Sequence, residues 1–133
     1  MGRVQGLQGV NGVTAIPSLG KGYTDSRAKK AGIVFDLKTF KVTGEVPSAE
    51  DTDGVIYDPA SKRVFIANGD ANVATVIDTA TDKQVALVPL GGKPEYLASD
   101  EAGHVFVNLT DKKEIARIDA KAAKVDGRFS MPD

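Results

Sequence analysis

The stretch DGVIYDPASKRVFIANGDANVATVIDTATDKQV, residues 53–85, decides the fold of this chain. Short apolar runs alternate in it with turn-forming steps, which are Asp-Pro, then Asn-Gly-Asp, then the polar residues 78–82. No apolar spacing of three to four residues runs through the stretch, so a helix is not predicted. The pattern predicts four β-strands in about 40 residues.

The same unit recurs on both sides of this stretch. Phe35-Asp36 matches Ile77-Asp78 after 42 residues, and Ile77-Asp78 matches Ile118-Asp119 after a further 41 residues. Gly22-Tyr23 and Val64-Phe65 are also 42 residues apart. Repeats of 20 to 50 residues are typical of solenoids, propellers and arrays. Four antiparallel strands per repeat favour a β-propeller blade among these architectures.

The predicted fold class is therefore all-β, a β-propeller segment with three blades of four antiparallel strands each. The blades are expected at approximately residues 10–47, 53–90 and 94–131, within one domain of residues 1–133. Runs such as RVFIAN are apolar on both sides, as a blade that packs between two neighbours requires. The predicted strands are residues 13–16, 22–25, 33–37, 41–46, 54–57, 64–67, 73–77, 84–90, 96–98, 104–108, 114–118 and 124–129.

Residues 73–108, VATVIDTATDKQVALVPLGGKPEYLASDEAGHVFVN, resemble the YVTN-type (YncE-like) β-propeller repeat. That repeat has an aromatic strand, an Asn, the pattern V-x-V-I-D-T-x-T and a Gly-Pro turn into the next blade. The resemblance covers essentially the whole chain, and it implies the propeller fold and a lean toward a periplasmic or secreted parent. It implies no reaction, because the family is recognised by its scaffold.

Composition narrows the function classes. The chain has 133 residues, of which 41% are hydrophobic and 26% charged, and a net charge of −1. Its 17 basic and 18 acidic residues are interspersed, so a nucleic-acid partner is not predicted. The absence of cysteine excludes disulfides and thiol catalysis. No apolar run approaches the ~18 residues of a membrane helix, and no signal-peptide core is present at the start.

Three blades are fewer than the four to eight that close a propeller. Open apolar faces are therefore expected on the first and third blades, and such faces mark interfaces. We predict self-association through these open blade faces, two copies supplying six blades. Arg3-Val4 matches the end of an outermost strand and would compete there with Arg128-Phe129 of a partner. The chain is thus interpreted either as part of a larger propeller or as a self-assembling half.

Three polar residues mark a candidate ligand-binding site. Asn11, Asp53 and Glu95 are spaced 42 residues apart, each where an innermost strand is expected to begin. Equivalent positions surround the propeller axis at one face, so their oxygens should converge on a small polar ligand. No cofactor is predicted, although calcium or another divalent cation would suit the same oxygens. Three donors cannot complete the six to eight ligands of calcium, and a purely structural role in turns is the competing interpretation.

Other polar residues are interpreted as structural. Asp36, Asp78 and Asp119 each follow an apolar strand and precede a turn, where a carboxylate can accept backbone N–H bonds. Asn68 and Asn108 are expected to form turns at the ends of second strands, and a place in a site at one face is the alternative.

The basic residues of the loops and strand starts carry no signature of catalysis or phosphate binding. Arg27, Lys29 and Lys30 are expected in an exposed charged turn. His104 is the only histidine, and no G-x-S-x-G elbow accompanies it, so no catalytic residue is predicted. The Gly91-Gly92-Lys93 run lacks the spacing of a phosphate loop.

The leading interpretation is a noncatalytic ligand- or protein-binding module on a propeller scaffold. The alternative is a metal-assisted lactonase or hydrolase in which Glu95 or Asp53 acts as the base. Six-bladed lactonase-like propellers hold a divalent cation with a similar set of Glu, Asn and Asp residues. A structural role in a surface layer is a third interpretation.

Overall fold

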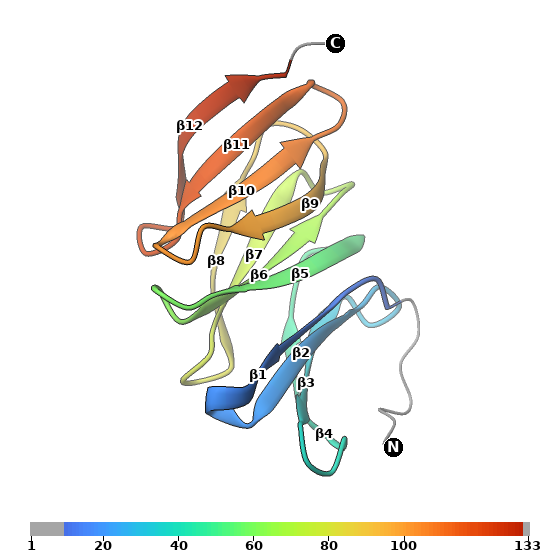
Figure 1. Ribbon diagram of the computed structural model, residues 1–133. Helices are drawn as coiled ribbons and strands as arrows, with labels where there is room; N and C mark the ends of the chain where they lie inside the picture. The colour runs from blue at the N-terminus through green and yellow to red at the C-terminus, as the bar shows by residue number, and fades with distance from the viewer. Residues whose placement is uncertain (1–9, 132–133) are drawn as a thin grey trace.

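The structure is a computed structural model that describes residues 10–131. These residues form three four-stranded antiparallel sheets, which follow one another along the chain (Figure 1). This confirms the predicted fold class. The sheets are blade 1, with β1 (Val13–Ile16), β2 (Lys21–Ser26), β3 (Ala31–Asp36) and β4 (Val42–Pro47); blade 2, with β5 (Thr52–Asp58), β6 (Arg63–Asn68), β7 (Val73–Asp78) and β8 (Lys83–Pro89); and blade 3, with β9 (Pro94–Ser99), β10 (His104–Leu109), β11 (Glu114–Asp119) and β12 (Lys124–Ser130).

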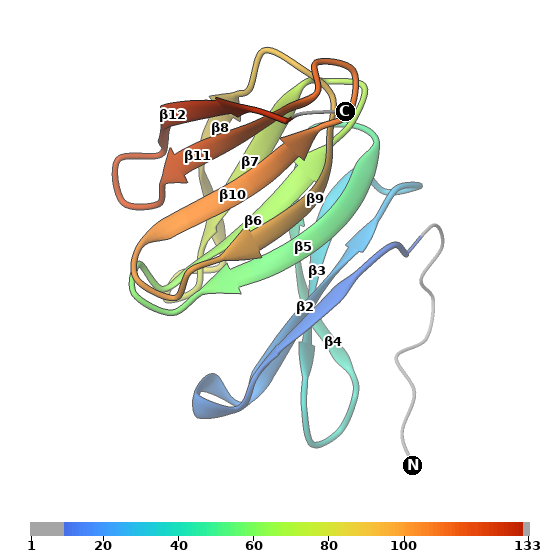
Figure 2. The ribbon, with the colours of Figure 1, turned by 45° about the horizontal axis from the view of Figure 1, so that its top comes forward.

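Each blade is a meander in which strands adjacent in sequence are also hydrogen-bonded neighbours. The first strands of the three blades lie side by side, with β5 in contact with both β1 and β9 (Figure 2). The only helix in the part of the chain that the structure describes is a 3-10 turn, η1 (Pro17–Leu19). No helix there is long and apolar enough to cross a membrane.

All twelve strands lie where the sequence predicts them, with small shifts at their ends. A register shift recurs between the two outer strands of every blade, beside Val34, Val76 and Arg117. An extra residue in a β-bulge bends the strand and increases its twist. The bulge therefore belongs to the repeat and gives each outer strand the same bend.

The core lies between blades, and β6 shows how it is built. Val64 and Ile66 are fully buried in the cluster shared with blade 1, whereas Phe65 is fully buried in the cluster shared with blade 3. Successive side chains of a strand point to opposite faces, so an unbroken apolar run serves both neighbours. The cluster between blades 1 and 2 contains Ile16, Tyr23, Val34, Val46, Val55, Val64, Ile66 and Ile77. That between blades 2 and 3 contains Phe65, Ala74, Val76, Val88, Leu90, Val105, Val107, Leu109, Ala116, Ile118 and Ala120.

Polar bonds add to this packing between blades 1 and 2. Lys21 Nζ donates to the Thr79 carbonyl (2.6 Å) and forms an ion pair with Asp82 (3.0 Å). The buried Tyr23 hydroxyl also donates to Asp82. Burial and this hydrogen bond raise the pKa of Tyr23 above its usual value, so the phenol stays protonated at neutral pH.

The three predicted Asp turns are confirmed. Asp36 Oδ1 accepts from the Thr39 and Lys38 backbone nitrogens at 2.9 and 2.7 Å. Asp119 Oδ1 accepts in the same way from Ala122 (3.0 Å) and Lys121 (3.1 Å). These bonds stabilise the carboxylate form and lower the pKa of both groups. The third member of the set, one repeat after Asp36, accepts at 3.1 Å from the backbone nitrogen of Ala80.

The expectation that Asn68 and Asn108 form turns is wrong. Asn68 ends β6 and is fully buried, where its Nδ2 donates to the Ala49 carbonyl (2.8 Å) and its Oδ1 accepts from Thr75 Oγ1 (2.7 Å). Asn108 lies in β10 and accepts from the Tyr96 nitrogen (2.7 Å). Asn68 thus satisfies the backbone of the segment that leads into β5, and Asn108 satisfies a backbone group of the neighbouring strand β9.

The two outer blade faces differ from each other. On blade 1, Ile33 and Phe35 point away from blade 2 but are only 0% and 6% exposed. The Phe35 ring lies over Gly22, where a Cβ atom would come within 2.6 Å of it, so the ring packs back on its own sheet. On blade 3, Tyr96 and Phe129 are 70% and 46% exposed. The expected overlap of Arg3-Val4 with an outer strand falls outside the described residues.

The repeat supplies a matched pair of substitutions that tests where stability resides. Phe65 is fully buried between blades 2 and 3, and Phe106 occupies the equivalent position of blade 3 with its ring partly in solvent. We expect Phe65→Ala to lower the free energy of unfolding by about 3–5 kcal/mol and Phe106→Ala by less than half as much. Urea denaturation measures both values. Equal losses would show that blade-on-blade packing does not carry the stability.

The hydrogen-bonded Asp turns predict that the stability of the fold depends on pH in the acidic range. Because the pKa values of Asp36 and Asp119 are lowered in the fold, their contribution is present above the unfolded-state pKa of about 3.9 and is lost as pH falls through the folded value. The double variant Asp36→Asn/Asp119→Asn keeps the acceptor oxygens but removes this titration. We expect its melting temperature to fall less steeply than that of the unmodified chain below about pH 4. Glu101→Gln serves as the control, and equal slopes for all three proteins would contradict the assignment.

Candidate functional site

The structure brings the three predicted site residues to one place. Asn11 precedes β1, Asp53 is the second residue of β5, and Glu95 is the second residue of β9. All three line a hollow of about 210 Å³ together with Tyr96 and Leu97. Residues 42 positions apart therefore lie close together at the axis, because adjacent innermost strands begin at the same face.

Asn11 connects two blades. Its backbone nitrogen donates to Asp25 Oδ1 (2.9 Å) in blade 1, and its Nδ2 donates to the Thr52 carbonyl (2.6 Å) at the start of β5. Asp25 also accepts from the Gly12 nitrogen (2.9 Å) and is fully buried. The Asn11 amide is thus held at the junction of blades 1 and 2, and it shapes the wall of the hollow.

Asp53 lies in a crowded electrostatic environment. Arg27 Nη2 contacts Asp53 Oδ1 at 2.8 Å, and Arg27 Nε contacts Asp51 Oδ1 at 3.3 Å. Partial burial raises the pKa of Asp53, and the neighbouring Asp51 charge raises it further, while Arg27 acts in the opposite direction. One guanidinium therefore holds two carboxylates that would otherwise repel each other.

A larger polar hollow of about 450 Å³ adjoins the first, and we name it the axial pocket. Glu95 is exposed in it, and within residues 10–131 no hydrogen bond or ion pair engages its carboxylate. Lys93 Nζ lies 3.5 Å from Asp70 Oδ1 across the pocket. Carboxylates outnumber cations in the lining, which consists of Arg27, Asp51, Asp53, Asp70, Lys93, Glu95 and Thr110.

Sequence reasoning missed most of this lining. It placed Arg27 in a solvated turn, yet Arg27, Gly69 and Thr110 occupy equivalent repeat positions, and so do Asp51 and Lys93. The same offsets that identified Asp53 and Glu95 could therefore have found them. Gly69 is also required sterically, because a Cβ atom there would lie 2.6 Å from Asp51 Oδ2 and closer still to Asp53.

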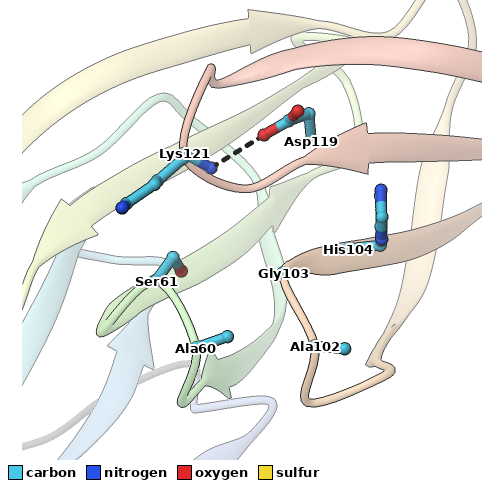
Figure 3. Close-up of a pocket in the computed structure, with 7 residues that line it drawn as sticks. All are labelled: Ala60, Ser61, Ala102, Gly103, His104, Asp119 and Lys121. Atoms are coloured by element: carbon cyan, nitrogen blue, oxygen red, sulfur yellow. Dashed lines mark hydrogen bonds between the residues drawn. The ribbon is translucent and has the colours of Figure 1, made fainter.

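A separate hollow of about 380 Å³ surrounds His104 near the start of β10 (Figure 3). His104 lies 3.2 Å from Asp100 through Nδ1 and 3.6 Å from Asp126 through Nε2. Ser61 comes from the β5–β6 turn, and its hydroxyl donates to the Asp58 carbonyl (3.4 Å). Serine and histidine are thus engaged by different partners, and this geometry does not activate a nucleophile.

The acidic and histidine side chains of the described residues do not by themselves form a metal site. Residues 10–131 contain no group of three or more His, Cys, Asp or Glu residues placed to hold a metal ion. A cation at the axis would therefore need the Asn11 oxygen beside Asp53 and Glu95.

No protein-family model and no curated protein sequence matches the chain. Many solved structures share its fold, including the following two. Hydrazine synthase from Kuenenia stuttgartiensis aligns with a TM-score of 0.83 and 18% identity over 95% of this chain and 38% of that chain. Dihydro-heme d1 dehydrogenase NirN in complex with DHE aligns with a TM-score of 0.73 and 17% identity over 92% of this chain and 28% of that chain.

Both neighbours are β-propeller proteins, so the fold and the arrangement of blades define this chain as a β-propeller segment. It spans less than two fifths of the length of either protein. At these identities the likeness concerns the fold.

The burial and charge of the site around Asp53 predict that ionisation of this carboxyl lowers the stability of the fold. Since the pKa of Asp53 is raised in the fold, its ionisation opposes folding, and stability falls as pH rises from the unfolded value of about 3.9 through the folded value. We expect Asp53→Asn to be at least as stable as the unmodified chain at pH 7, with an advantage that shrinks toward pH 3. Thermal melts across this range measure it. Asp70→Asn, which removes a more exposed charge from the same pocket, should show no such gain.

Proposed function

We propose that this chain is a noncatalytic binding module built from YVTN-type propeller repeats, and that its axial pocket takes a small polar ligand. One observation carries the proposal. Asp53 and Glu95, from adjacent innermost strands, open onto the same pocket, and the Glu95 carboxylate is left without a partner among residues 10–131. An acceptor held at the mouth of a rigid scaffold is suited to a ligand that supplies donors.

The charges of the lining narrow the ligand class. Asp51, Asp53, Asp70 and Glu95 outnumber Arg27 and Lys93 by four to two. The pocket should therefore prefer a molecule that donates hydrogen bonds, such as an amine or a polyhydroxyl compound, over an anion. Its volume of about 450 Å³ is within the range of small-molecule sites.

The repeat assignment supports a binding role without defining a reaction. The pattern around residues 73–108 resembles the YVTN-type repeat, and propellers of that type share a scaffold rather than a chemistry. Hydrazine synthase and NirN are named as enzymes, but the likeness to them is one of fold. We therefore attribute neither reaction to this chain.

The metal-assisted hydrolase alternative is less well supported by the contacts. It needs the Asn11 oxygen as a third ligand, because residues 10–131 contain no group of three or more His, Cys, Asp or Glu residues placed to hold a metal ion. Asp53, the candidate base, is bound by Arg27 at 2.8 Å. A base in this role needs a free carboxylate oxygen, and this carboxylate is already engaged by a guanidinium.

Amide-resolved NMR titrations test the proposal with three probes, which are putrescine, glucose and calcium chloride. We expect putrescine or glucose to shift the backbone signals of residues 51–54 and 93–96, with affinities in about the millimolar to high-micromolar range. Glu95→Gln should weaken binding of the diamine by about tenfold or more, because a charge-assisted hydrogen bond is lost.

Glu101→Gln is the matched control, since it removes an equally exposed carboxylate from the β9–β10 turn. It should bind like the unmodified chain. Shifts that are absent with every probe, or that persist unchanged in Glu95→Gln, would refute the ligand proposal. Saturable binding of calcium alone, one ion per chain and lost in both Asp53→Asn and Glu95→Gln, would favour the hydrolase alternative.

A further inference from the structure

The repeat itself shows what a carboxylate at the mouth of the axial pocket can bind. At the junction of blades 1 and 2, Arg27 Nη2 donates to Asp53 Oδ1 at 2.8 Å, and Arg27 Nε lies 3.3 Å from Asp51 Oδ1. Arg27 follows β2 of blade 1, whereas both carboxylates lie at the start of blade 2. A guanidinium from one blade is thus held by carboxylates of the next blade.

The junction of blades 2 and 3 has the carboxylate but lacks the guanidinium. An offset of 42 residues carries Asp53 to Glu95, and the same offset carries Arg27 to Gly69. Gly69 has no side chain that could reach into the next blade. Within residues 10–131 no hydrogen bond or ion pair engages the Glu95 carboxylate. The second junction therefore presents the acceptor of the first junction without its cation.

Lys93, which lies at this second junction, does not replace the guanidinium. Its Nζ is 3.5 Å from Asp70 Oδ1, and its Cε is 3.3 Å from the place that a Cβ atom on Gly69 would occupy. It therefore lies beside Gly69 and is paired with Asp70. An ammonium is a compact charge, whereas a planar guanidinium can donate to both oxygens of one carboxylate. Among the described residues, both oxygens of Glu95 are open to such a donor.

We infer that the axial pocket binds a guanidinium group on a short aliphatic stem, and that Glu95 is the residue that holds it. The inference rests on the proposed function, and it narrows the ligand from hydrogen-bond donors in general to one chemical class. A free guanidinium compound and the arginine side chain of a polypeptide both present this group. Their recognition chemistry is the same, so the experiment distinguishes the two sources.

The shape of the site suits such a stem. Glu95 lines the axial pocket of about 450 Å³ and also the adjoining hollow of about 210 Å³. Val13, Val55 and Leu97 belong to the lining of the smaller hollow, so part of its wall is apolar. A ligand whose guanidinium meets Glu95 can place its methylene groups along this wall, as the stems of arginine side chains do on apolar protein surfaces.

NMR titrations of the full chain with agmatine and with putrescine test the inference. These compounds have the same stem and the same charge, and they differ in that a guanidinium replaces one ammonium. We expect agmatine to bind about threefold to tenfold more tightly, with backbone shifts centred on residues 93–96. Glu95→Gln should weaken agmatine binding by about tenfold or more, whereas the control Glu101→Gln should leave it unchanged. Circular dichroism verifies that each variant is folded.

Lys93 supplies a second readout, because its charge repels a cationic ligand in the same pocket. Lys93→Gln should tighten agmatine binding by about twofold or more. A site built for anions would respond in the opposite direction, so weaker binding of agmatine to Lys93→Gln would overturn the inference.

The comparison between the two junctions is tested by Arg27→Ala. Without the guanidinium, Asp53 is left in the state of Glu95. The variant should therefore bind a second molecule of agmatine, and Arg27→Ala/Asp53→Asn should lose it again. Arg27→Gln takes the place of the alanine variant if that one does not fold. Failure to gain the second molecule would show that a carboxylate at this repeat position does not recruit a guanidinium.

N-acetylarginine methylamide, which carries the guanidinium on a peptide backbone, identifies the source of the ligand. Binding as tight as that of agmatine assigns the arginine side chain of a polypeptide, and binding of agmatine alone assigns a free small molecule. Agmatine that binds no more tightly than putrescine, or equally well to Glu95→Gln, overturns the inference. The proposed function survives that result if putrescine or glucose still binds, and it fails together with the inference if no probe binds.

Discussion

Packing of one blade against the next is the interaction on which the structure depends. β6 shows it most directly, since Val64 and Ile66 are buried toward blade 1 while Phe65 is buried toward blade 3. No sheet here has a hydrophobic face that it could bury by itself, so every sheet requires a neighbour. Hydrogen bonds that cross between blades, such as Lys21 to Thr79 and Ser99 to Asp58, fix the angle of this packing rather than supply its energy.

The axial pocket is a consequence of that stacking. Its charged residues come from three blades, and no single blade contains enough of them to enclose a ligand. Arg27 in blade 1 holds Asp51 and Asp53 in blade 2, and the absence of a side chain at Gly69 leaves room for both carboxylates. Like charges held this close oppose folding, and a scaffold stabilised elsewhere can tolerate them. A site that retains such repulsion between carboxylates is one in which a functional role is expected.

Much of the fold could be predicted from the sequence because equivalent positions of the repeats carry similar residue types. The strands follow from apolar runs, and the Asp turns follow from Asp36 and its equivalents, whose side chains act locally. The left-handed backbone positions could not be predicted in this way. Phe40, Asp82 and Ala123 share a positive φ at one repeat position although their side chains have little in common. There the pairing of the flanking strands imposes the conformation, and the residue type does not signal it.

The candidate site could be predicted only as far as its spacing. The 42-residue steps located Asn11, Asp53 and Glu95, but sequence alone cannot show that Arg27 reaches into the next blade or that Asn68 is buried, because both facts depend on how blades stack. The packing of the Phe35 ring over Gly22 could not be predicted either, because it depends on the register of two adjacent strands of blade 1.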